Sequence, residues 1–182
     1  MKTIKKISVL FIALAISGFV SSCGSDDGGG GGGSSVSEGV MKAKVDGNWV
    51  TTESMTGAAT LVESAGALTL QGNTGGTSSK AFMFVINGFE GQDTYVIGGE
   101  NSIYVNASYT EITVDMNNPM NTQSVTWQAP YSGGGEVGKI VFSEVTDTHV
   151  KGTFEFTAKK NTGDGSLKTI SEGSFNLKIT RH

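Results

Sequence analysis

The strongest constraint on the fold is the alternation of apolar and polar side chains near the C-terminal end of the chain. The alternating apolar positions are Val150, Gly152, Phe154 and Phe156 in residues 149–157, and Phe175, Leu177 and Ile179 in residues 173–180. A period of two sends successive side chains to opposite faces of a β-strand, one buried and one in water. We expect these two strands to pair antiparallel across a loop at residues 161–166 and to close the fold.

Shorter segments separated by turn residues extend this strand pattern toward the N-terminus. The Asp46-Gly47-Asn48 sequence between two apolar segments is typical of a tight hairpin, because its central residues must adopt positive φ. Further strands are predicted at residues 41–45, 49–50, 58–62, 67–71, 80–87, 93–97, 103–107, 111–115, 124–128 and 139–144. Residues 80–87 are apolar on both faces, which predicts a central strand buried on both sides.

Helical periodicity is absent over any long stretch, and residues 53–60 are the best candidate for a short helical turn. About ten short strands separated by turns predict a single all-β domain. We place this domain at residues 40–182. A single antiparallel β-sandwich and a lipocalin-like up-and-down barrel both fit the pattern.

The first 22 residues have the composition of a secretory signal peptide, which precedes the domain. Three lysines come first, at Lys2, Lys5 and Lys6, and an apolar stretch and two small residues follow. The apolar stretch of about 14 residues is too short to span a bilayer, which takes about 20 residues. No later segment approaches that length without charges, so we expect no transmembrane helix.

The tetrapeptide Val20-Ser21-Ser22-Cys23 ends this segment and resembles the lipobox of bacterial lipoproteins, an aliphatic residue and two small residues before an invariant cysteine. The resemblance implies a diacylglycerol on the Cys23 sulfur, cleavage before Cys23, and usually a third acyl chain on the new amino terminus. One acyl chain holds a protein only marginally, whereas two or three anchor it durably. Because Cys23 is the only cysteine, no internal disulfide can form.

Residues 23–39 are predicted to be a lipidated, disordered linker, because a Gly/Ser-rich composition cannot bury apolar surface. The residues Ser25, Asp26 and Asp27 resemble the export signal that sends some Bacteroidetes lipoproteins to the outer face of the outer membrane. The fuller signal carries one more acidic residue, where this chain has Gly28. Display at the cell surface is therefore favoured, and an orientation facing the periplasm is the alternative.

Two motifs of the domain are familiar. The segments Val45-Asp46-Gly47-Asn48-Trp49 and Gly152-Thr153-Phe154-Glu155-Phe156 resemble the VDG-x-W start and GTF-x-F strand of uncharacterised Bacteroidetes outer-membrane lipoproteins. The resemblance implies an all-β domain of unknown function and supplies no active-site residues.

The mature chain carries few residues suited to catalysis or metal binding. Its only histidines are His149, at a strand start, and His182, the last residue, and neither lies in a nucleophile motif. No carboxylate pair has a distinctive setting, so we expect no enzymatic activity and no cofactor. A His/Cys zinc site is nearly excluded, and no metal is predicted. The oxygen-rich loops at residues 115–121 and 161–166 do not match the EF-hand spacing, and calcium binding there is left open.

The net charge of the mature chain limits the classes of partner that it can bind. Removing residues 1–22 takes away three lysines and shifts the net charge from −4 to −7, which argues against a nucleic-acid partner. The membrane is contacted through the lipid on Cys23. Aromatic side chains that could stack on sugar rings are Trp49, Tyr95, Tyr104, Tyr109, Trp127 and Tyr131. Among these, Trp127 and Tyr131 flank Pro130 near a glycine loop and are the candidate ligand contacts.

The resulting hypothesis is a lipid-anchored cell-envelope β-domain with a binding role, for a glycan, a small ligand or a protein. A structural or assembly subunit of an outer-membrane complex is the alternative, and a small hydrolase is a third, less favoured interpretation. The oligomeric state is left open.

Substituting Cys23→Ala tests the lipidation prediction. The variant should accumulate as an uncleaved or unacylated precursor, because the thiol that receives the diacylglycerol is gone. Metabolic labelling with palmitate and fractionation of outer membranes measure this, and Ser34→Ala in the linker is the matched control that should remain acylated. Labelled palmitate in Cys23→Ala, together with its recovery in the outer membrane, would contradict the prediction.

Overall fold

The computed structural model describes residues 36–101 and 103–182. The predicted signal peptide, the lipidation site Cys23 and the Ser25-Asp26-Asp27 signal lie outside the described residues. Among the described residues, no helix has both the length and the hydropathy needed to cross a bilayer.

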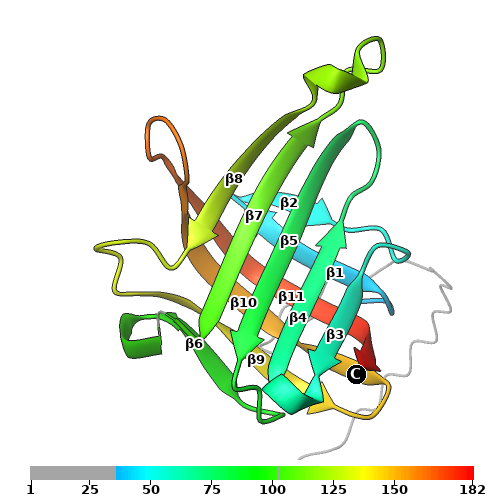
Figure 1. Cartoon of the computed structure of the whole chain (residues 1–182), viewed down its shortest axis with the longest axis vertical. Coiled ribbons are helices and arrows are strands. Elements are labelled where there is room, and N and C mark those ends of the chain that lie inside the picture. The colour runs from blue at the N-terminus through cyan, green and yellow to red at the C-terminus, as the bar shows by residue number, and fades with distance from the viewer. Residues whose placement is uncertain (1–35, 102) are drawn as a thin grey trace, which may run out of the picture. The chain divides into compact units, whose positions relative to one another are not determined.

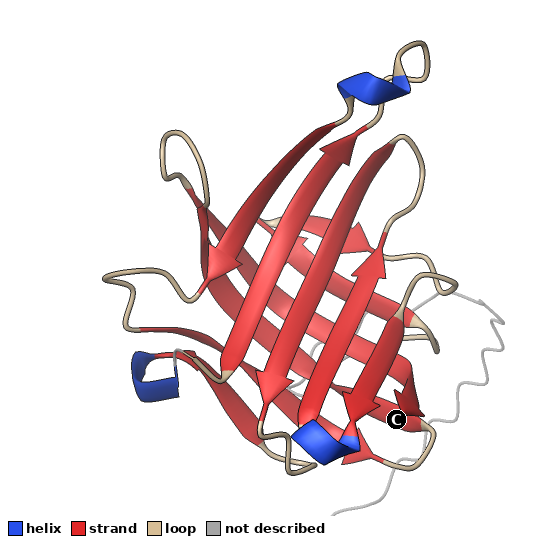
Figure 2. Ribbon diagram, viewed as in Figure 1, coloured by secondary structure: helices blue, strands red, loops and turns tan. Residues whose placement is uncertain are grey.

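The described chain is built almost entirely of strands, which confirms the all-β prediction (Figure 2). The strands are β1 Val40–Val45, β2 Asn48–Thr51, β3 Ala58–Val62, β4 Ala67–Asn73, β5 Ser78–Asn87, β6 Thr94–Gly98, β7 Val105–Thr113, β8 Gln123–Ala129, β9 Glu136–Val145, β10 His149–Lys160 and β11 Leu167–Arg181. Three short 3-10 turns occur between strands: η1 Glu63–Ala65, η2 Gly99–Asn101 and η3 Pro119–Asn121.

The strands form one hydrogen-bonded sheet of 11 strands that folds into two facing layers (Figure 1). The near layer has the order β3-β4-β5-β7-β8, and the far layer has the order β2-β1-β11-β10-β9-β6. Two pairings join the layers: β8 meets the end of β10, and β3 runs parallel to the end of β11. The arrangement is compatible with both the sandwich and the barrel alternatives. The predicted antiparallel pairing of the two C-terminal strands, β10 and β11, is confirmed.

Aromatic rings fill the space between the layers. Phe84 of the near layer lies 5.0 Å from Phe154 and 5.5 Å from Phe156 of the far layer, measured between ring centroids. Phe82 contacts Phe154 in the same edge-on manner at 5.6 Å. These tilted and edge-on contacts are the arrangements that aromatic quadrupoles favour, and they add to the burial of apolar area. The aromatic side chains at alternating positions of β5 and β10 therefore pack the two layers against each other.

Two glycines of the far layer make room for these rings. In the β10–β11 register Gly152 lies opposite Phe175, and Phe154 lies opposite Gly173. A Cβ at Gly152 would overlap the Phe175 ring and the Val141 carbonyl oxygen, and a Cβ at Gly173 would overlap the Phe154 ring. Each ring thus covers the glycine of the partner strand, a pairing known to compensate for a glycine within a sheet.

The tight turn after β1 has the predicted geometry. Asp46 has a φ of 47° and Gly47 a φ of 82°, the two positive values that a two-residue hairpin requires. The Asp46 carboxylate also accepts a hydrogen bond from the Thr169 backbone N–H at 2.9 Å, so the turn is held against β11.

Three of the local predictions were wrong. Strand β5 is buried on one side only, since Met83 is 42% exposed while Phe82 and Phe84 are fully buried. Residues 53–60 hold a turn and the start of β3 in place of a helical turn. The segments 103–107 and 111–115 are not two strands, because one continuous strand, β7, pairs with β5 through residue 113.

The outer surface of the far layer carries most of the ion pairs in the described chain. Examples are Lys44 with Glu172 at 2.8 Å and Lys151 with Glu144 at 2.9 Å. The first described residues attach to the same surface: the Glu38 carboxylate contacts the Lys178 ammonium at 2.9 Å and the His149 ring at 2.6 Å.

The hydrogen bonds that Lys178 and His149 donate lower the pKa of the Glu38 carboxyl group. Residues 36–39 are also bound through backbone groups, since the Gly39 N–H donates to the Asn176 carbonyl oxygen at 2.7 Å. These contacts hold residues 36–39 against the outer surface of the far layer.

Truncating Phe154→Ala should lower the free energy of unfolding by about 3–5 kcal/mol, because a ring that joins both layers is replaced by a cavity. Met83→Ala is the matched control and should change stability by less than about 1 kcal/mol, because its side chain lies on the outer surface. Urea titration followed by tryptophan fluorescence measures both. Equal losses in the two variants would contradict the described orientation of β5.

The Glu38 contacts predict a dependence on pH. A carboxyl group with a lowered pKa favours the attached state at pH values above the ordinary pKa of 4.5, and this contribution disappears as pH falls through the lowered value. The protection of the Gly39 amide against hydrogen exchange, taken as the measured rate relative to the intrinsic rate at the same pH, should therefore decrease below that pH. In Glu38→Gln this decrease should be absent; if it persists, another group controls the attachment.

Candidate functional site

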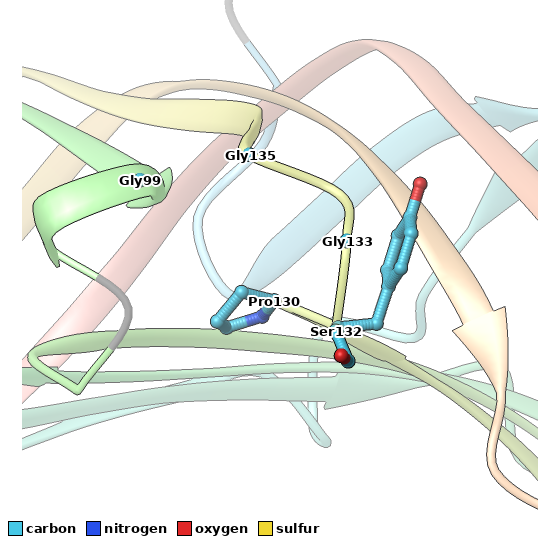
Figure 3. Close-up of a pocket in the computed structure, with 6 residues that line it drawn as sticks. Gly99, Pro130, Ser132, Gly133 and Gly135 are labelled. Carbon is cyan, nitrogen blue, oxygen red and sulfur yellow. The ribbon is translucent and has the colours of Figure 1, made fainter.

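A pocket of about 400 Å³ lies between the β8–β9 loop and the turn that follows β6. Its walls are formed by Gly99, Pro130, Tyr131, Ser132, Gly133 and Gly135. Figure 3 shows Gly99 on its turn across from Pro130, Ser132 and the two loop glycines. A pocket of this volume lies within the range of small-molecule sites.

Close backbone contacts hold the two walls together. The Gly99 N–H donates to the Gly135 carbonyl oxygen at 2.9 Å. At Gly98, with a φ of 94°, a Cβ would overlap that same carbonyl oxygen, so only glycine permits this approach. The pocket is therefore fixed by backbone geometry on both sides, in addition to the β6–β9 pairing beneath it.

Tyr131 is one of the two aromatic residues predicted to contact a ligand, and the structure places it on the pocket wall. The absence of a Cβ at Gly134 lets the Tyr131 ring pack against the loop backbone. The Gly134 N–H donates to the Tyr131 carbonyl oxygen at 3.0 Å and closes the turn. The Lys159 ammonium lies 6.0 Å from the ring centroid, at the outer limit of a cation–π contact. Tyr131 is thus a partly exposed ring on a braced loop.

Trp127, the other predicted contact, lies elsewhere. It is on strand β8, points between the layers and is only 7% exposed, so it is not an exposed loop aromatic. Its ring packs against Tyr109 at 5.9 Å, and no described residue accepts a hydrogen bond from its indole N–H. The structure therefore does not bring Trp127 and Tyr131 together as two walls of one pocket.

Charged groups cover the aromatic pair of Trp127 and Tyr109 at the end of the core. The Lys168 ammonium lies 4.9 Å from the Trp127 ring centroid and contacts the carboxylates of Asp46 at 3.3 Å and Glu111 at 3.4 Å. The Tyr109 hydroxyl donates to Glu111 at 2.9 Å. Burial, reinforced by the Glu111 carboxylate, raises the pKa of the Tyr109 hydroxyl, which keeps it neutral. This cluster closes one end of the core.

The remaining sequence candidates have structural roles within the described chain. His149 bridges Glu38 and the Thr148 hydroxyl. The carboxylates of both oxygen-rich loops accept backbone hydrogen bonds: Asp115 from Asn117 at 2.9 Å, and Asp164 from Ser166 at 3.1 Å. Such Asx turns explain why these loops are rich in oxygen. Across residues 36–101 and 103–182, no group of three or more His, Cys, Asp or Glu side chains is arranged to hold a metal ion.

The sequence indicated one wall of the pocket but not the other. The wall that it indicated is the glycine loop next to Pro130 and Tyr131, which is a local pattern in the sequence. Gly99 gave no signal, because its contact with Gly135 depends on the pairing of β6 with β9, which are far apart in sequence. Lys168 was missed for the same reason, since its partners come from the β1–β2 turn, β7 and β8.

Comparison with known protein families gives one match. The model of a domain of unknown function, DUF6252, matches residues 37–177. The chain belongs to this family. The match covers every strand except the last residues of β11. No curated protein and no solved structure matches the chain.

Proposed function

We propose that this DUF6252 protein is a lipid-anchored binding module of the cell envelope, most simply displayed at the cell surface. The lipobox-like residues before Cys23 and the Ser25-Asp26-Asp27 segment support the anchoring and the location. The family is one of unknown function, so the ligand class is inferred from the residues of the pocket.

The observation that carries the binding role is the braced pocket with the Tyr131 ring on its wall. The face of a tyrosine ring suits the C–H surface of a sugar, and its hydroxyl provides a polar contact. Ser132 and the glycine backbone add groups that donate and accept hydrogen bonds without charge. The ligand proposed for this pocket is therefore a small, uncharged, hydroxyl-rich ring compound such as a sugar residue.

Little rearrangement is needed for binding at this pocket. The hydrogen bond from Gly99 to Gly135 and the turn closed by Gly134 hold the loop before any ligand arrives. A site that is formed in advance loses less conformational entropy on binding than a loop that must become ordered.

Replacing the ring tests this proposal. Tyr131→Ala should weaken binding of a soluble neutral oligosaccharide by about tenfold, whereas Tyr131→Phe should retain most of the affinity because the stacking face is kept. Trp49→Ala is the control, since Trp49 is an exposed aromatic residue of the far layer. Titration calorimetry with a panel of neutral oligosaccharides, combined with NMR shifts of the Gly133 and Gly135 amides, provides the measurement. The proposal fails if no oligosaccharide in the panel shifts these amides, or if Trp49→Ala weakens binding equally.

A further inference from the structure

The outward surface of the near layer has an unusual composition. We call it the uncharged face: the even-numbered residues of β3, β7 and β8 and the odd-numbered residues of β4 and β5, which alternate with the buried core positions. None of these residues is Asp, Glu, Lys, Arg or His. This is the side of β3, β4, β5, β7 and β8 that lies toward the viewer in Figure 1.

The two charged residues of these five strands, Lys80 and Glu111, have the opposite parity and lie on the other side of the pleat. They face one another in the β5–β7 register. The outer surface of the far layer differs sharply, with ion pairs such as Lys44–Glu172, Lys139–Glu155 and Lys151–Glu144. Charge is therefore segregated between the two outer surfaces of the domain.

The uncharged face combines hydrogen-bonding and apolar side chains in continuous rows across the strands. The central row is Ala58, Gln71, Met83, Ser108 and Gln128. A neighbouring row runs through Thr60, Thr69, Val85 and Asn106. Hydroxyl and amide side chains both donate and accept hydrogen bonds. Exposed Met83 in the centre adds an apolar contact.

We propose that the uncharged face is a docking surface for a neutral, hydroxyl-rich polysaccharide. Polysaccharide hydroxyl groups match the Ser, Thr, Asn and Gln side chains in hydrogen bonding, and the C–H faces of the sugar rings match the Ala, Val and Met side chains. Binding requires no desolvation of a charged side chain, which would otherwise weaken the association. The proposal is independent of the Tyr131 pocket, because the face includes none of the pocket residues.

Other partners fit this surface less well. Nucleic acid and anionic polymers require Lys or Arg, which the face lacks. Protein partners are held mainly by Trp, Tyr and Arg side chains, and the face has none of these. With strands about 4.8 Å apart and outward residues about 6.8 Å apart along each strand, the face measures roughly 600 Å². That is below the roughly 800 Å² per partner that a standard protein interface buries, which argues against a second copy of the chain.

A surface without an aromatic platform relies on many weak contacts made together. Each hydrogen bond to a sugar hydroxyl replaces one to water and contributes little by itself. A polymer that spans several rows makes these contacts at once, whereas a single sugar makes only a few. The face should therefore retain an extended chain or an insoluble polysaccharide, and its binding should be insensitive to salt because no charges take part.

Cosedimentation with insoluble polysaccharides tests the proposal. The full chain, extracted in a polyoxyethylene detergent, is mixed with insoluble β-glucan, α-glucan, mannan or chitin, at about 0.1 M and about 1 M salt. Retention on at least one of these polymers, unchanged by salt, is expected. No retention on any of them overturns the proposal, as does retention that high salt abolishes.

Paired variants locate the binding surface. Thr69→Lys combined with Ser108→Lys places two charges at half-buried positions of the uncharged face and should lower retention by about tenfold or more. Thr153→Lys combined with Thr157→Lys is the matched control on the outer surface of β10 and should leave retention unchanged. Circular dichroism and thermal melting establish that both variants are folded. Equal effects of the two pairs would overturn the assignment to this face.

Two further outcomes separate this proposal from its alternatives. Tyr131→Ala should leave retention on the insoluble polymer within about twofold, because the pocket is a separate site. If Tyr131→Ala abolishes retention while the Thr69/Ser108 pair does not, the pocket alone holds the polymer and the docking surface is refuted. If the chain self-associates in analytical ultracentrifugation and the Thr69/Ser108 pair disperses it, the occupant is a second copy and the polysaccharide proposal is wrong.

Discussion

The reciprocal pairing of a phenylalanine with a glycine across β10 and β11 is the contact on which the rest of the fold depends. Phe175 covers Gly152, and Phe154 covers Gly173. Because the glycines have no side chains, the rings occupy the space above them, and Phe154 also contacts Phe84 of the near layer. The two longest strands of the sheet thus present Phe154 to Phe82 and Phe84 of the near layer. The strands that form the uncharged face and the loops that form the pocket both extend from this core.

The sequence predicted what depends on local alternation and failed where the result depends on partners far along the chain. The hairpin at Asp46-Gly47 and the pairing of β10 with β11 followed from turn chemistry and a period of two. The exposure of Met83 did not, because an apolar residue on an outward position looks the same as a buried one until the layers are known. The Gly99 wall of the pocket and the Lys168 contacts depended likewise on pairings between distant strands.

The buried indole N–H of Trp127 lies where the aromatic core meets the charged side chains at its end. A buried donor without an acceptor carries a desolvation cost of about 1–3 kcal/mol. Here the ring lies against Tyr109 in a tilted contact and beneath the Lys168 ammonium, so aromatic contact and cation–π attraction offset part of that cost. Lys168 is in turn held by Asp46, whose other oxygen fixes the first hairpin to β11. The same few side chains therefore close the core and attach the first hairpin to β11.

The N-terminal end of the described chain lies on the charged outer surface and not on the uncharged one. The first described residues lie on the charged surface of the far layer, where Asn176 donates to the Val36 carbonyl oxygen and Glu38 contacts Lys178. Under the proposed anchoring, the linker from Cys23 would join the domain on this surface. The uncharged face belongs to the other layer, so attachment to the membrane would not need to cover it. Ion pairs on the attachment side keep that surface solvated, and the side without charges is left to meet an uncharged partner.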